Sequence, residues 1–254
     1  MKKTTLFLCG LLISATLFAQ STANTKSEKK SGATIPDKKN CVKLNLTSLA
    51  FRNIALQYER ALGPKISVAC QIRLMPKGSL PFTSALDNAV DSFNISAIKI
   101  NSFAITPEFR YYVRKSMKGF YLAPYFRFRN MGMEAPLDFT NASNVKETIL
   151  LTGKVNSFGG GLMIGSHFNI GKSFSLDWFI LGFQYMASSG SLTATTTNTL
   201  SANDQAELSK QLNSNGDSKF FKYSYTVNSH GATVDTKFGL VGFRGFGLNF
   251  GYRF

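Results

Sequence analysis

Apolar residues alternate with small or polar residues through most of the chain, and the alternation is clearest in residues 245–254. One face of that stretch carries Phe246, Leu248, Phe250, Tyr252 and Phe254. The other face is mostly glycine. A period of two predicts a β-strand. Glycine suits the crowded interior of a narrow barrel better than an outer surface, so we expect the apolar face to point outward into lipid.

The same alternation predicts seven earlier strands, joined by connections that alternate between short and long. The short turns are residues 61–65, 114–119 and 169–172, and the long loops are residues 75–97, 130–154 and 186–236. Only the first outer connection, residues 50–53, departs from this order by being short. Short turns at one end and long loops at the other are typical of outer-membrane barrels. The sequence therefore predicts an all-β fold, an eight-stranded antiparallel transmembrane β-barrel with long extracellular loops.

Two local features add to this picture. Pro107 and Pro124 fall within predicted strands, where each removes a ladder hydrogen bond, and we expect one local irregularity to hold both. Within the last long loop, residues 201–212 predict a short helix. Ser201 is its expected cap, and a modest apolar stripe follows. That helix is expected to lie over the barrel mouth, to contact a partner, or to pack within its own loop.

The first residues have the features of a secretory leader. Lys2 and Lys3 precede an apolar run that ends in a small residue at Ala19, so we predict a signal peptide at residues 1–19. Residues 20–40 are rich in lysine, serine and threonine without apolar periodicity, which predicts a disordered periplasmic tail. The barrel domain is then residues 41–254, placed in the outer membrane with both of its ends periplasmic.

Composition supports this assignment and suggests partners. The chain holds 23 phenylalanines and a formal net charge of +15. Such a charge favours anionic partners, and we expect outer-membrane lipid and lipopolysaccharide. The basic residues follow no recognised nucleic-acid motif, so no nucleic-acid partner is predicted. Arg244 has lipid-facing parity near the expected outer interface, where it would contact a lipopolysaccharide phosphate or extend toward the headgroups without a specific lipid.

Charged residues also fall on the inward face of the predicted strands. They are Lys43, Glu59, Arg73, Glu108, Arg110, Arg127, Arg129, Asp177 and Arg253. The interior of an eight-stranded barrel is just wide enough for side chains to fill, and buried charges need partners. We therefore predict a network of ion pairs and hydrogen bonds that plugs the lumen. A relay that conducts protons or small ions is the alternative. Cys41 and Cys70 have opposite parity and are expected to be free thiols.

No catalytic, cofactor or metal site is predicted. Some eight-stranded barrels modify lipid A with a histidine, a serine and an acid near the outer leaflet. Here His167 has inward parity at the periplasmic end, and His230 follows Ser229 in a loop without a placed acid. Residues 159–161 form a glycine run that precedes no helix, so they do not predict a phosphate cradle. We therefore predict a non-enzymatic protein, with a lipid A-modifying enzyme as the less favoured alternative.

Two resemblances extend these predictions. Phe250, Tyr252 and Phe254 resemble the carboxy-terminal signature of outer-membrane barrels, which implies the barrel assembly machinery as a partner. Four segments are similar to a family of small outer-membrane proteins from Bacteroidota that is defined only as a domain of unknown function. They are residues 42–47, 54–63, 105–112 and 119–127. This resemblance covers roughly residues 42–254 and implies a barrel without assigned catalytic residues. We expect a structural or interaction role, through the surface loops or within a larger outer-membrane complex.

Overall fold

The computed structural model describes residues 36–79, 97–140, 146–196, 198–213 and 221–254. Residues 33–254 belong to one compact unit. Its strands are β1 (Asn40–Asn45), β2 (Ile54–Ala61), β3 (Ile66–Ser79), β4 (Lys99–Tyr112), β5 (Gly119–Thr140), β6 (Lys146–Ile170), β7 (Phe174–Thr196), β8 (Phe221–Asn228), β9 (Gly231–Arg244) and β10 (Gly247–Arg253). Its helices are α1 (Leu46–Ala50) and α3 (Ala202–Asn213). The predicted signal peptide lies outside the described residues.

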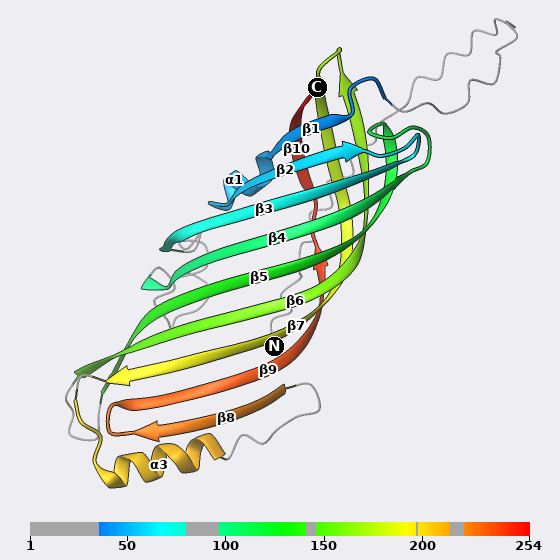
Figure 1. The fold of residues 1–254 in the computed structure, drawn as a ribbon. Coiled ribbons are helices and arrows are strands. Elements are labelled where there is room, and N and C mark those ends of the chain that lie inside the picture. Colours follow the sequence, from blue (N-terminus) through cyan, green and yellow to red (C-terminus); the bar gives the residue numbers. More distant parts are fainter. Residues whose placement is uncertain (1–35, 80–96, 141–145, 197, 214–220) are drawn as a thin grey trace, which may run out of the picture. The chain divides into compact units, whose positions relative to one another are not determined.

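The strands form one antiparallel sheet that closes into a ring. Their order is β10-β1-β2-β3-β4-β5-β6-β7-β9-β8, and β10 also pairs with β7. Strand β10 thus joins the two sides, with Tyr252 opposite Val42 of β1 and Leu248 opposite Trp178 of β7. Figure 1 shows β10 running between these two strands. The all-β, antiparallel character predicted from the sequence is confirmed.

Side chains alternate between the two faces of this sheet as the sequence predicts. In β2 every second residue is buried, and in β10 Gly247, Asn249, Gly251 and Arg253 are buried. Large apolar side chains are exposed on the outer face of every ring strand, including Leu56, Phe126, Leu162, Trp178 and Phe250. The inner face carries the buried charged residues. The polar interior and the apolar exterior are therefore reversed relative to a water-soluble protein.

The sheet has ten strands, of which eight, β10 and β1–β7, close the ring, and β9 and β8 extend it beyond the predicted eight. The predicted last strand is divided into β9 and β10 by an interruption at residues 245–246. Strand β8 is additional and lies within the predicted loop 186–236. Strand β8 pairs with β9 from Phe221–Phe238 to Asn228–Gly231.

Two of the three predicted long loops contain long stretches of strand. Strand β5 continues to Thr140 and β6 begins at Lys146, so most of residues 130–154 form a hairpin. Strand β7 likewise continues to Thr196, inside predicted loop 186–236. In residues 186–196 Ser, Thr and Gly predominate, so the apolar alternation is weak. Residues 131–139 still alternate, with Met131, Met133, Leu137 and Phe139 at alternate positions, and the loop prediction overlooked this pattern. Threonine and valine still favour extended backbone. Of predicted loop 75–97, residues 80–96 lie outside the described residues.

The short turns are confirmed at all three predicted places. They join β2 to β3, β4 to β5 and β6 to β7. Gly119 and Gly171 have positive φ angles of 85° and 57° at two of these turns, where a side chain would strain the backbone. The prolines are accommodated without a change of register: β4 and β5 pair at Ile105–Phe128 and again at Glu108–Tyr125, and the pairs between them are interrupted.

Both described helices lie in connections between strands. The predicted connection 50–53 is preceded by α1, whose N-cap Asn45 accepts a hydrogen bond of 2.7 Å from the Ser48 backbone N–H. The predicted helix 201–212 is confirmed as α3. It packs beside β8, because the Tyr225 hydroxyl donates to the Ser209 carbonyl at 3.2 Å. Neither described helix is long and apolar enough to cross a membrane.

The end of the predicted tail contacts the sheet. The Lys38 ammonium donates to Ser173 Oγ at 2.6 Å, and the Lys39 carbonyl accepts from the Ala61 backbone N–H at 2.8 Å. Strand β1 begins at Asn40. The prediction of a disordered tail up to residue 40 is therefore wrong for its last residues, because polar residues there satisfy backbone groups at the end of the ring. The rest of the tail lies outside the described residues.

Candidate functional site

A cluster of ion pairs fills the interior of the ring. Glu59 of β2 and Asp177 of β7 both contact Lys43 of β1, and the Lys43–Asp177 distance is 2.5 Å. Arg110 of β4 lies 3.1 Å from Glu59, 2.7 Å from Asp177 and 2.6 Å from Glu108. All five side chains are fully buried. Strand register brings two of them together: Glu59 pairs with Ala69 of β3, which pairs with Glu108 of β4.

Hydroxyl and amide groups complete this cluster. Glu59 Oε1 accepts hydrogen bonds from Tyr112 at 2.6 Å and Ser67 at 2.5 Å. Asp177 Oδ1 accepts from Tyr121 at 2.8 Å, and Glu108 Oε2 accepts from Gln57 at 3.0 Å. Both oxygens of each carboxylate therefore have partners. The charged members of the cluster were predicted from the sequence, but these neutral partners were not. Parity would have found two of them, because Tyr112 shares the inward parity of Arg110, and Tyr121 shares that of Arg127.

One group within the cluster has the composition of a metal site. Ligand atoms of Glu59, His167 and Asp177 lie within 4.8 Å of one another. However, Lys43 and Arg110 both contact Glu59 Oε2 and Asp177 Oδ2. The space beside these oxygens, where a metal cation would have to bind, is thus occupied by two positively charged side chains. The donor set does not fit a metal ion and instead has the chemistry of a locked ion-pair network.

The prediction that Arg244 faces lipid is wrong. Its side chain is buried, with Nη1 3.0 Å from Glu108 Oε1 and Nη2 2.9 Å from Gln71 Oε1. Its guanidinium lies 4.5 Å from the centroid of the Phe179 ring. The interruption between β9 and β10 changes the parity, so alternation counted back from residue 254 assigns Arg244 to the wrong face. Strand β7 changes parity at the same level, since Gly182 pairs with Arg244 and Phe179 with Gly247.

The other predicted lumen arginines do not join the acidic cluster. Arg253 donates to the backbone carbonyl of Lys172 at 3.2 Å. Arg127 donates to Thr106 Oγ1 at 3.1 Å. Arg73 and Arg129 have no ion pair with any residue that the structure describes, and the Nε of each is buried without an acceptor. Arg73, Arg127, Arg129 and Arg244 line one cavity of about 590 Å³ beside α1, which we call the arginine cavity.

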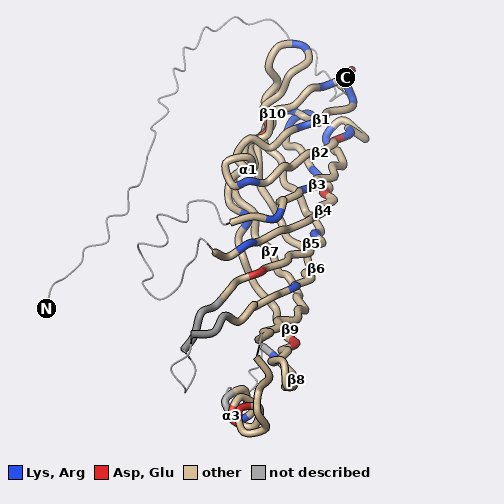
Figure 2. Tube along the Cα trace, turned by 90° about the vertical axis from the view of Figure 1, so that its left-hand side faces the viewer, with Lys and Arg blue, Asp and Glu red and all other residues tan. Residues whose placement is uncertain are grey.

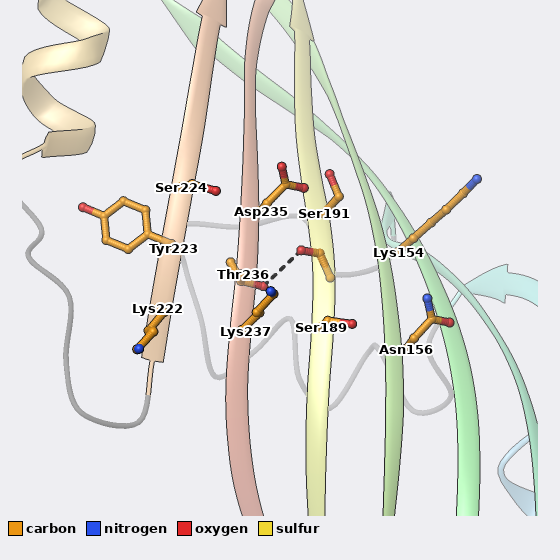
Figure 3. Close-up of a pocket in the computed structure, with 11 residues that line it drawn as sticks. Lys154, Asn156, Ser189, Ser191, Lys222, Tyr223, Ser224, Asp235, Thr236 and Lys237 are labelled. Atoms are coloured by element: carbon orange, nitrogen blue, oxygen red, sulfur yellow. Dashed lines mark hydrogen bonds between the residues drawn. The ribbon is translucent and has the colours of Figure 1, made fainter.

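Exposed apolar side chains, such as Phe126, Phe158, Leu162, Phe183 and Tyr185, form what we call the apolar band of the outer face. A second concave surface lies on the same face beyond this band. It has a volume of about 760 Å³ and is formed by β6, β7, β8 and β9. Its charged residues are Lys154, Lys222, Lys237 and Asp235. Figure 3 shows these side chains together with Ser189 and Ser191, and the Thr236 hydroxyl bonded to the Gly190 carbonyl. We call this surface the outer cleft. Basic residues also outnumber acidic ones along the described chain as a whole (Figure 2).

The two histidines lie in different environments, one buried and one exposed. His167 is buried beside Tyr112, with 3.5 Å between its Nδ1 and the hydroxyl. His230 is exposed, and its Nδ1 lies 3.0 Å from Ser229 Oγ. Among the described residues, no carboxylate contacts His230. The serine–histidine pair therefore lacks the acid that orients and charges a catalytic histidine.

The fold and its interior define the class: an all-β protein whose closed antiparallel sheet surrounds buried ion pairs. The chain belongs to the family described as Protein of unknown function (DUF3575), whose model matches residues 12–208. The predicted resemblance to a family of unknown function is thereby confirmed, although the match begins earlier and ends earlier than expected, before β8. No curated protein and no solved structure matches the chain.

Proposed function

We propose that this protein is a non-enzymatic outer-membrane β-barrel with a side-chain-filled lumen, which serves a structural or interaction role at the cell surface. The reversed polarity of the sheet carries the proposal. Lys43, Glu59 and Asp177 are inside and fully buried, whereas large apolar side chains such as Phe126, at 63% exposed, cover the outside. A continuous apolar surface of this kind is costly in water and is the surface that lipid covers.

The filled interior supports an interaction role over a channel. The ion-pair cluster is sealed toward the short turns by Cys41, Ala61 and Met117, which form a buried apolar group. Toward the other end, Arg244 stacks on Phe179 and pairs with Glu108. A charge held by several partners in a water-poor space is stabilised in place and exchanges poorly.

The long strands supply the interaction surface. A strand needs about 9–11 residues to cross a bilayer, but β6 has 25 residues and β7 has 23. At about 3.3 Å per residue, β6 is roughly 80 Å long, so much of it lies beyond the membrane. This extension carries the outer cleft. Among the described strands β8 pairs only with β9, and α3 packs beside β8.

The other proposed partners follow from the proposed insertion into the outer membrane. Outer-membrane lipid and lipopolysaccharide contact the apolar outer face. The barrel assembly machinery engages β10 and the residue that follows it, where Phe250, Tyr252 and Phe254 are all exposed. Export uses the leader at residues 1–19.

Purification and planar-bilayer recording test the membrane and lumen parts of this proposal. We expect the protein to require detergent, to migrate as a heat-modifiable band and to insert into bilayers without resolvable single-channel conductance. A monodisperse protein in buffer without surfactant contradicts the barrel, and stepwise conductance favours the channel alternative. A change in lipid A mass on deletion of the gene favours the enzyme.

Site-specific photo-crosslinking in intact cells tests the interaction role. A photoreactive residue replaces Ser191 or Ser224 in the outer cleft, and the same residue replaces Leu162 on the apolar face as the control. We expect one discrete protein adduct from the cleft positions and lipid adducts alone from position 162. Absence of any protein adduct from the cleft positions contradicts the role assigned to this surface.

A further inference from the structure

Three of the arginines that line the arginine cavity have no counter-charge among the described residues. Each of the three inward carboxylates, Glu59, Glu108 and Asp177, already contacts two or more cationic groups. Those cations are Lys43, Arg110 and Arg244. Arg73, Arg127 and Arg129 have no ion pair within the described part of the chain. The three carboxylates are thus balanced by Lys43, Arg110 and Arg244, and the positive charges of Arg73, Arg127 and Arg129 are left without a carboxylate.

The unpaired arginines surround the same space. Arg73 comes from β3 and Arg127 and Arg129 come from β5, and all three line the arginine cavity with Arg244. No described lining residue of this cavity is acidic. The buried Nε groups of Arg73, Arg129 and Arg244 have no acceptor. Like charges gathered in a poorly solvated space repel one another, so an anion that enters is strongly favoured.

Guanidinium groups select the kind of anion. Arginine presents several N–H donors in a planar fork that matches the oxygens of phosphate, and phosphate carries enough acceptors for several arginines at once. Neutral donors and acceptors complete the lining, including Asn45, Ser48 and Gln184. The cavity therefore has the chemistry of a phosphate site.

The rim of the cavity is apolar and faces outward. Phe51, at the end of α1, is 52% exposed, and Phe243 and Phe246, at the break between β9 and β10, are 71% and 72% exposed. The pairing of β1 with β10 ends at Asn45–Asn249, and α1 continues from there in place of a strand. The cavity thus opens on a seam of the sheet, where the aromatic rim is continuous with the apolar outer face.

We propose that the arginine cavity binds the phosphate group of an anionic lipid, with the lipid's acyl portion lying against Phe243 and Phe246 on the outer face. This inference rests on the proposed function, because lipid reaches the seam only when the ring is embedded in a membrane. A free phosphate ion would satisfy the arginines but would leave the aromatic rim without a role. The two sources of phosphate are separated by experiment.

Native mass spectrometry of the full chain in mild detergent tests the proposal, with phosphatidylglycerol or inorganic phosphate added as the probe. We expect one tightly retained phosphatidylglycerol per protein. The variant R73Q/R127Q/R129Q is expected to bind it at least about tenfold more weakly, because several charge-assisted hydrogen bonds are lost. The matched control K154Q/K222Q/K237Q removes three positive charges from the outer cleft and is expected to bind as the wild type does.

Thermal unfolding provides the second readout and covers the possibility of a folding defect. Phosphatidylglycerol is expected to raise the unfolding temperature of the wild type and the control, but not that of R73Q/R127Q/R129Q. Equal lipid binding by the wild type and R73Q/R127Q/R129Q overturns the site. Full stabilisation by inorganic phosphate alone, with no further effect of lipid, overturns the lipid assignment. A wild type that is heat-modifiable and inserts into vesicles but retains no lipid overturns this inference and leaves the proposed function standing.

Discussion

Glu108 connects two levels of the ring's interior. Its Oε2 lies 2.6 Å from Arg110, in the ion-pair cluster, and its Oε1 lies 3.0 Å from Arg244, beside the arginine cavity. Gln57 adds a further hydrogen bond to Oε2. The side chain is fully buried, and its removal leaves Arg110 and Arg244 without this partner.

We therefore expect Glu108→Ala to destabilise the protein by about 3–5 kcal/mol, the usual cost of leaving buried charges without their partner. The measurement is the temperature at which the heat-modifiable band is lost on a gel. Glu134→Ala is the control, because its pair with Lys77 is exposed, at 41% and 51%, and such pairs contribute about 1 kcal/mol or less. A Glu108→Ala protein that melts with the wild type would show that the network does not hold the ring together.

Strand parity makes much of this interior predictable from single residues. Lys43, Glu59 and Asp177 meet because each lies on the inward face of a strand whose alternation is unbroken near it. Arg244 shows where this prediction fails. The interruption at residues 245–246 changes which alternate residues face inward, and the sequence does not predict that interruption. Which charges pair is also unpredictable from parity alone, because it depends on the level of each residue along its own strand.

At the scale of elements, the sequence predicts the short turns and the start of α3 better than it predicts the lengths of the longest strands. The turns carry glycine and lysine and are found where they are expected, and α3 begins at its predicted cap. Strands β5, β6 and β7 instead continue for many residues past their predicted ends. In the extension of β7, which is rich in Ser, Thr and Gly, the period-two signal fades although the hydrogen-bonded ladder continues. In the extension of β5 the alternation persists through Met131, Met133 and Phe139, so this strand was predictable from the sequence.

The cap of α3 can be tested with one chemical change at two positions. Ser201 Oγ accepts from the Asp204 backbone N–H at 3.2 Å, and the Asp204 carboxylate accepts from the Ser201 backbone N–H at 3.1 Å. We expect Ser201→Ala to destabilise the helix by about 1 kcal/mol. Ser209→Ala, within the helix, is expected to be neutral or slightly stabilising, because its hydroxyl only bonds back to the Gln205 carbonyl.

Hydrogen exchange of the α3 amides measures both variants. Faster exchange confined to α3 is the expected result for Ser201→Ala, with the ring strands unchanged. Equal effects of the two substitutions would contradict the assigned cap.

At the scale of the whole molecule, one question decides the proposed function: whether the apolar outer face meets lipid or water. Strand β6 contributes to both the apolar outer face and the outer cleft. Leu162 lies within the exposed apolar stretch between Phe158 and Ile170, and Asn156 and Lys154 continue the same face into the outer cleft. Ser189 of β7 pairs with Asn156 and marks the polar side of this boundary.

Lysine substitution on the two sides of that boundary distinguishes the environments. In a bilayer, Leu162→Lys is expected to cost about 2–4 kcal/mol, because a charge near the middle of the hydrocarbon must leave water, whereas Ser189→Lys at the polar side costs about 1 kcal/mol or less. The measurement is the folding free energy in vesicles by denaturant titration. If the outer face met water, both lysines would be solvated and the two variants would unfold alike. A depth-dependent penalty places the apolar band in lipid, and its absence removes the basis for the barrel.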